Sequence, residues 1–111
     1  MFLHDAIYTR LNEFKSLCKR NKVHSIYAFG SSVTDDFKTS SSDIDLLVEI
    51  DKPDSVDRGE TLMILWDQLE VFFQRKVDLL TSASIKNPVL RKSIDNSKVL
   101  IYRGKEEMVF I

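Results

Sequence analysis

Residues 27–50, YAFGSSVTDDFKTSSSDIDLLVEI, constrain the fold of this chain more than any other segment. An apolar run ends at Gly30-Ser31, a polar loop follows, and a second apolar run opens with Asp43-Ile44-Asp45. Apolar runs bounded by turn residues are typical of buried strands. This order predicts a strand, a tight turn, a loop or short helix, and a second strand that carries two carboxylates.

The two aspartates of the second strand are spaced to share one face. Successive side chains of a strand point to opposite faces, so Asp43 and Asp45 face away from Ile44 and its apolar neighbours. Two nearby carboxylates repel by roughly 4 kcal/mol at an effective dielectric of about 20. A cation between them removes this cost, and oxygen ligands without Cys or His favour Mg²⁺ or Mn²⁺ over zinc. Taken alone, the pair is also compatible with solvated acids at a strand end.

The Gly30-Ser31 pair is suited to approach a phosphate group. Glycine lets the main chain turn sharply, and a helix that starts there would direct free N–H groups at an anion, with the Ser31 hydroxyl as a further donor. An ordinary turn at a strand end is the alternative interpretation.

A third carboxylate, Asp78, interrupts the apolar segment 75–81. Val77 and Leu79 are expected to face one side of a strand, which leaves Asp78 on the other. An acid among apolar neighbours costs solvation free energy unless it reaches solvent, a partner or a metal. Asp78 is therefore a candidate functional residue.

Four strands are expected, at residues 24–29, 44–50, 75–81 and 98–102. Apolar side chains at helical spacing predict one amphipathic helix over residues 3–20, and Asp57 is expected to cap a second long helix. Asn87-Pro88 predicts the start of a further helix with Leu90 and Ile94 facing inward.

Less regular segments leave some alternatives open. In the polar loop, Val33 and Phe37 are expected to anchor a short helix to the sheet. Trp66 is expected to pack in the core, and stacking on a nucleobase is the alternative interpretation. The apolar end of the tail 105–111 fits either packing on its own domain or docking on a partner.

The size and composition indicate one domain, residues 1–111, without covalent crosslinks. The formal charge of −1 provides no general attraction to nucleic acid or anionic membranes, so neither is expected as a partner. Cys18 is the only cysteine, which favours a core role and a reducing, cytoplasmic compartment. No apolar segment has the length of a membrane span, and the first residues do not resemble a signal peptide.

The combination of motifs resembles the signature of the polymerase β-like nucleotidyltransferase superfamily, which is Gly-Ser, a polar spacer and Asp-hydrophobic-Asp-hydrophobic. In this chain Gly30-Ser31 is followed by eleven residues and then by Asp43-Ile44-Asp45-Leu46. The resemblance covers nearly the whole chain. It implies an α+β fold with a small mixed sheet flanked by helices, in which Asp78 stands on the strand beside the Asp-x-Asp strand.

The small size makes the chain similar to minimal nucleotidyltransferases (MNT), the antitoxins of HEPN/MNT pairs. Such proteins are understood to transfer AMP from ATP to a tyrosine hydroxyl of a HEPN ribonuclease toxin, which neutralises it within a hetero-oligomer. The resemblance implies that Asp43, Asp45 and Asp78 are catalytic and hold Mg²⁺, with two ions expected, or Mn²⁺. It further implies that Gly30 and Ser31 bind the triphosphate.

One departure from the family pattern concerns the residues after Gly-Ser. Members often continue with small and basic residues, whereas this chain has residues 32–35, SVTD, followed by Asp36. Two acids replace a cation, and Lys38, Arg75 or Arg91 are candidates to supply the charge. The departure leaves open a catalytically impaired antitoxin that acts by binding and occlusion. A separate alternative is the catalytic subunit of a small-molecule nucleotidyltransferase.

Overall fold

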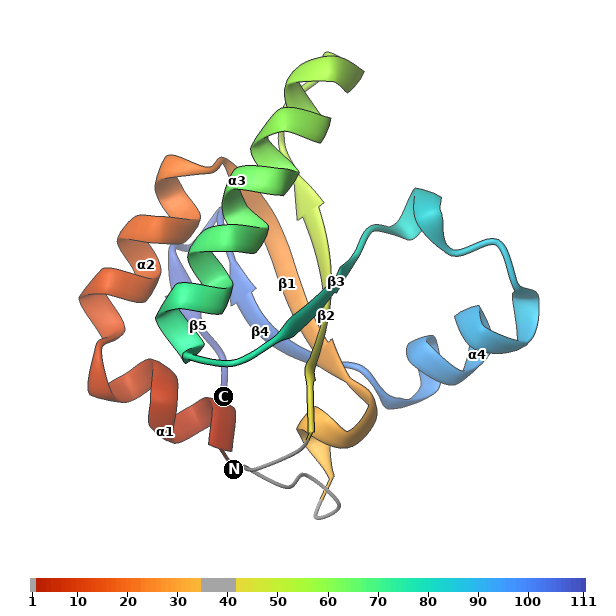
Figure 1. Cartoon of the computed structure of the whole chain (residues 1–111), viewed down its shortest axis with the longest axis horizontal. Helices are drawn as coiled ribbons and strands as arrows, with labels where there is room; N and C mark the ends of the chain where they lie inside the picture. Colours follow the sequence, from red (N-terminus) through yellow and green to blue (C-terminus); the bar gives the residue numbers. More distant parts are fainter. Residues whose placement is uncertain (1, 35–41) are drawn as a thin grey trace.

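The computed structural model describes residues 2–34 and 42–111, which form a five-stranded sheet in the order β3-β2-β1-β4-β5 (Figure 1). Strand β1 pairs antiparallel with β2 and β4, β2 pairs parallel with β3, and β4 pairs antiparallel with β5. The fold is α+β with a mixed sheet, as the family resemblance implied. The strands are β1 (Val23–Phe29), β2 (Ile44–Ile50), β3 (Val77–Leu80), β4 (Val99–Arg103) and β5 (Met108–Val109).

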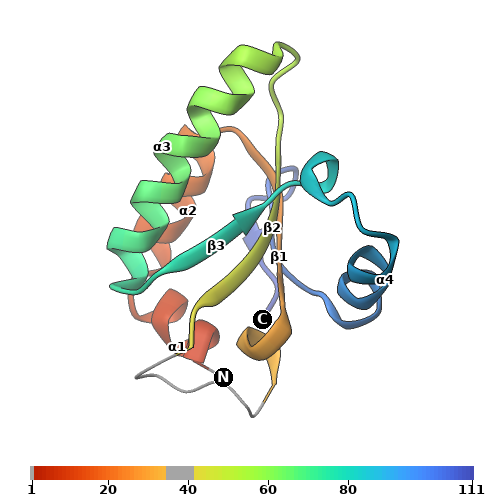
Figure 2. The same cartoon turned by 45° about the vertical axis from the view of Figure 1, so that its right-hand side comes forward.

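Helices cover both faces of this sheet (Figure 2). Three of them, α1 (Phe2–Thr9), α2 (Leu11–Arg20) and α3 (Ser55–Phe73), lie on one face, and α4 (Pro88–Ser97) lies on the other. Two short 3₁₀ turns, η1 (Gly30–Val33) and η2 (Ser82–Ser84), follow β1 and β3. The main core lies between the sheet and the first three helices, and it includes the buried Cys18. A smaller cluster beneath α4 consists of Phe29, Leu47, Ile85 and Ile94.

The predicted single helix over residues 3–20 is wrong, because the chain leaves helical geometry at Arg10 (φ −135°, ψ 54°). The Arg10 guanidinium donates to the main-chain carbonyl of Phe72 near the end of α3, and its Cζ lies 4.3 Å from the centroid of the Phe72 ring. A cation at a helix C-terminus satisfies carbonyl groups that have no partner within the helix. This tertiary contact outweighs the local helical periodicity.

The cap of α3 is also displaced from its predicted position. The side chain of Asp54, and not that of Asp57, accepts hydrogen bonds from the main-chain N–H groups of Val56 and Asp57. Both residues suit an N-cap, but Asp54 lies in extended conformation (φ −80°, ψ 128°) directly before the first helical residue. The helix therefore begins at Ser55.

Helix α4 starts as predicted, with Asn87 accepting from the N–H groups of Val89 and Leu90 and Pro88 in the first turn. Ile94 is buried, whereas Leu90 is exposed, contrary to expectation. Arg91 is the residue that turns toward the preceding segment η2, where its guanidinium donates to the Ser82 carbonyl at 2.5 Å. This polar contact fixes the rotation of α4 and leaves Leu90 in solvent.

The C-terminal tail packs back on its own sheet. Val109 of β5 is buried, and the N–H of Phe110 donates to the Ile101 carbonyl at 2.9 Å. Met108 and Phe110 remain exposed. In the part of the chain that is described, no helix combines the length and apolar character needed to cross a membrane.

Candidate active site

Three adjacent strands bring the predicted site residues to one end of the sheet. Phe29, the last residue of β1, lies opposite Asp45 of β2, and Asp45 lies opposite Asp78 of β3. Gly30 directly follows Phe29, and Asp43 directly precedes β2. Figure 1 shows this end of the sheet, where β1 enters η1 and β2 begins.

Strand alternation places the carboxylates away from the main core. Asp45 is half-buried and Asp43 is exposed, whereas Ile44, Leu46 and Val48 are buried on the opposite face. On β3 the same alternation leaves Asp78 exposed between the buried Val77 and Leu79. The faces are those that the sequence predicted.

Gly30 lets the turn come directly against the Asp45 carboxylate. Its φ is +64°, a conformation that favours glycine, and a Cβ atom at this position would lie 2.7 Å from Asp45 Oδ2. Ser31 follows it in η1 and is half-buried. The predicted phosphate-binding turn and the predicted metal-binding carboxylate are therefore direct neighbours.

The sequence did not indicate a second contact between this turn and β2. The main-chain N–H of Asp45 donates to Ser32 Oγ at 2.8 Å, and Ser32 is 2% exposed. Val33 packs against the main core, as expected, whereas the other expected anchor, Phe37, lies outside the described residues. Nothing in the polar loop distinguishes Ser32 from its neighbouring serines, because its partner lies 13 positions away.

Two of the three basic side chains proposed to supply charge for the triphosphate donate hydrogen bonds to main-chain carbonyl groups instead. Arg75 donates to the Ser42 carbonyl at 3.1 Å, which joins the segment before β3 to the segment before Asp43. Arg91 donates to carbonyl groups at Ser82 and Ile85. The third candidate, Lys38, and the acidic pair 35–36 lie outside the described residues. Arg75 thus positions the start of the Asp-x-Asp segment.

The electrostatics of the site favour a cation. Burial, together with the negative charges of Asp78 and Asp43, raises the pKa of the Asp45 carboxyl to about 6. A carboxylate whose pKa is raised by burial and by neighbouring negative charges is stabilised by a bound cation.

The acidic side chains do not form a complete metal cage by themselves. Among the described residues, no three His, Cys, Asp or Glu side chains are grouped closely enough to hold an ion. Mg²⁺ is commonly held by one or two carboxylates together with substrate phosphates and water. The donor set at this end of the sheet fits that mode of binding.

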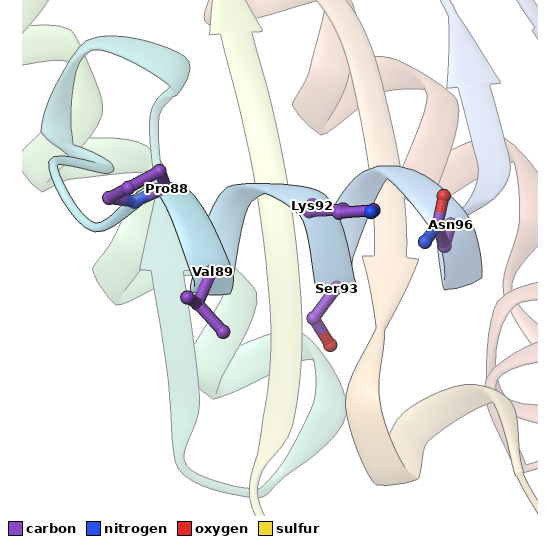
Figure 3. Close-up of a pocket in the computed structure, with 5 residues that line it drawn as sticks. All are labelled: Pro88, Val89, Lys92, Ser93 and Asn96. Atoms are coloured by element: carbon purple, nitrogen blue, oxygen red, sulfur yellow. The ribbon is translucent and has the colours of Figure 1, made fainter.

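A separate hollow of about 390 Å³ lies on α4 and has different chemistry (Figure 3). Figure 3 shows that all the residues lining it belong to this helix: Pro88, Val89, Lys92, Ser93 and Asn96. Its one charged side chain is that of Lys92, and it has no carboxylate to attract a cation. The candidate active site is therefore the row of residues at the strand ends.

Solved structures share this fold. A toxin–antitoxin crystal structure with AMP-PNP matches with a TM-score of 0.60 and 24% identity, over 88% of this chain and 77% of that chain. A complex of a tri-AMPylated HEPN toxin of Shewanella oneidensis with an MNT antitoxin matches with a TM-score of 0.51 and 23% identity, over 96% of this chain and 76% of that chain. At these identities the matches establish the fold.

Sequence comparison establishes the family. The family described as nucleotidyltransferase domain matches residues 11–101, a range that includes Gly30-Ser31 and the three aspartates. The Methanocaldococcus jannaschii protein MJ1379, named as a candidate protein adenylyltransferase, is 37% identical over 92 residues, which cover 82% of this chain and 90% of that protein. The chain belongs to the nucleotidyltransferase domain family.

Proposed function

We propose that this nucleotidyltransferase transfers AMP from ATP to a hydroxyl group of a partner protein. The observation that carries the proposal is the row formed by the Gly30 turn, Asp45 and Asp78 across three strands. The relative MJ1379, a candidate protein adenylyltransferase, supports a protein as the acceptor.

The partner we propose is a HEPN ribonuclease toxin, modified on a tyrosine and thereby neutralised. Support comes from the solved complexes of this fold, of which one contains AMP-PNP and another contains a tri-AMPylated HEPN toxin. The chain would then act as an antitoxin within a hetero-oligomer.

Mg²⁺ fits the carboxylates at the strand ends. Asp43 and Asp45 would hold it against the triphosphate, and Asp78 would contribute to a second ion. When bound, such ions neutralise charge on the attacking and leaving oxygens of a phosphoryl group. The raised pKa of Asp45 is consistent with a group that is stabilised by a cation.

The remaining work of the chain is positioning. Gly30 and Ser31 would bind the β and γ phosphates, which leaves the α-phosphorus near Asp45. The acceptor hydroxyl oxygen forms a bond to the α-phosphorus while the bond from that phosphorus to the bridging oxygen breaks, and pyrophosphate leaves. Asp78, which is exposed and lies opposite Asp45, would accept the hydroxyl proton. Catalysis of this kind depends on alignment and charge stabilisation.

Intact-mass analysis of the proposed HEPN toxin partner tests this proposal. The partner is incubated with this protein, ATP and Mg²⁺, beside the double variant Asp43→Ala/Asp45→Ala. A matched control is Asp67→Ala, because Asp67 is an exposed acid on α3, which packs on the face of the sheet opposite to the three aspartates.

We expect mass increments of one or more AMP units with the wild-type protein and the control, and none with the double variant. An unmodified partner that is nevertheless bound and inhibited would contradict the proposal and favour neutralisation by occlusion. Peptide mapping of the modified partner would identify the acceptor residue.

A further inference from the structure

Ser32 connects the turn that follows β1 to the strand that carries the Asp-x-Asp pair. We propose that Ser32 is a positioning residue for nucleotidyl transfer, which fixes the distance between the phosphate-binding turn and the Asp45 carboxylate. This inference rests on the proposed function, and it adds a residue that neither the sequence motif nor the family resemblance indicated.

The first observation is the contact itself. Ser32 Oγ accepts a hydrogen bond of 2.8 Å from the Asp45 main-chain N–H, across 13 positions of sequence. The preceding N–H of β2, that of Ile44, donates to the Lys76 carbonyl at 3.1 Å. Successive N–H groups therefore join the start of β2 to the segment before β3 and to η1.

The second observation is that the turn meets Asp45 at two points. Gly30 lies against the Asp45 carboxylate so closely that a Cβ atom would be 2.7 Å from Oδ2. Ser32, two residues later, holds the Asp45 main chain. With the side chain and the main chain of Asp45 both in contact with η1, neither element can shift without losing one contact.

The third observation is that the turn is anchored from within. Ser32 is 2% exposed, and Val33 beside it packs against the main core. A buried hydroxyl with a main-chain partner is costly to remove, because the partner is left unsatisfied. This geometry sets Ser32 apart from Ser31, which is half-buried in the same turn and carries the proposed phosphate contact.

In the proposed reaction, ATP is bound at two places, the turn at Gly30-Ser31 and the Asp45 carboxylate. If the turn binds the outer phosphates and Asp45 acts at the α-phosphate, the spacing between them decides whether the α-phosphorus is aligned for attack. A displacement of about 1 Å can cost about 100-fold in rate without abolishing binding. Loss of the Ser32 hydroxyl should therefore lower kcat far more than it raises KM for ATP.

The test compares Ser32→Ala with Ser32→Thr, which retains a hydroxyl, and with Ser25→Ala. Ser25 is a matched control because it is also a buried serine, 8% exposed, on β1 and remote from the turn. For each variant, kcat and KM for ATP are measured with the partner protein as acceptor, together with the thermal midpoint and the hydrogen exchange of the Asp45 amide without nucleotide.

We expect kcat of Ser32→Ala to fall about 10- to 100-fold with KM for ATP near the wild-type value, and Ser32→Thr to recover most of the activity. Ser25→Ala should keep wild-type kcat. The Asp45 amide should exchange about fivefold faster or more in Ser32→Ala, because it loses its hydrogen-bond acceptor. Equal kcat in Ser32→Ala and Ser25→Ala would overturn the positioning role.

The exchange measurement separates this inference from the proposed function. A folded wild-type protein that transfers nothing to its partner would overturn the proposed function and the kinetic part of this inference. Unchanged exchange of the Asp45 amide in Ser32→Ala would overturn the contact on its own, whatever the transfer assay gives.

Discussion

Asp45 and Asp78 lie directly opposite one another on the parallel strands β2 and β3. Asp45 is half-buried and Asp78 is exposed, so burial and the neighbouring charge both act on the Asp45 carboxyl and raise its pKa to about 6. Without a bound cation, the ionised Asp45 therefore lowers the stability of the folded protein at neutral pH. This relationship gives the first prediction.

Asp45→Asn should stabilise the metal-free protein at pH 7.5 but have little effect at pH 4. The folded pKa, about 6, exceeds the unfolded value of about 3.9, so the folded state binds more protons between these values. Wild-type stability therefore falls as the pH rises through this window, whereas the asparagine variant has no such loss. After allowance for solvent screening, we expect the free energy of unfolding of the variant to exceed that of the wild-type protein by about 1 kcal/mol at pH 7.5. Urea unfolding at both pH values measures this difference. An equal difference between variant and wild type at pH 4 and pH 7.5 would contradict this account.

Asp78→Asn should lower nucleotide transfer by at least about 100-fold, because the variant removes the carboxylate that we propose as proton acceptor and cation ligand. The fold should be unaffected, since Asp78 is exposed. Asp67→Asn on α3 is the control for removing one exposed acid, and it should keep full transfer. Single-turnover rates with saturating ATP measure the effect. Equal rates in the two variants would exclude a catalytic role for Asp78.

Gly30→Ala should abolish most transfer and destabilise the fold. The left-handed conformation costs about 1–2 kcal/mol for a residue with a Cβ atom, and that atom would collide with the Asp45 carboxylate. Gly59→Ala makes the same chemical change within α3, where nothing lies within 4 Å of the added atom. That variant should gain about 0.5–1 kcal/mol from the higher helix propensity of alanine. Thermal unfolding of both variants should give shifts of opposite sign.

Trp66→Phe should destabilise the protein by about 1 kcal/mol without changing KM for ATP. The Trp66 indole N–H donates to the Val77 carbonyl at 2.7 Å, and Glu70 accepts from the Val77 N–H at 2.9 Å, so two side chains of α3 satisfy the outer edge of β3. The indole N–H is therefore occupied within the protein, and Trp66 packs against the main core, as the sequence analysis expected. Denaturant unfolding and ATP titration together test this, and a raised KM in a stable variant would favour base stacking instead.

The departure from the family pattern after Gly30-Ser31 has a structural counterpart at Ser32. This position carries a buried hydroxyl that holds the Asp45 main chain, and it does not supply a cation. Arg75 likewise holds the Ser42 carbonyl, 33 positions earlier in the chain. Both Ser32 and Arg75 therefore hold the main chain around the start of the Asp-x-Asp strand.

The sequence by itself determined the features that depend on a few neighbouring residues. Strand alternation placed Asp45 and Asp78 away from the core, and Asn87-Pro88 marked the start of α4, because side-chain period and capping are local properties. The tertiary structure alone decided the break at Arg10, whose partner Phe72 is 62 positions away, and the contact between Ser32 and Asp45. Such contacts form only when packing brings distant segments together, and no pattern within either segment records the identity of its partner.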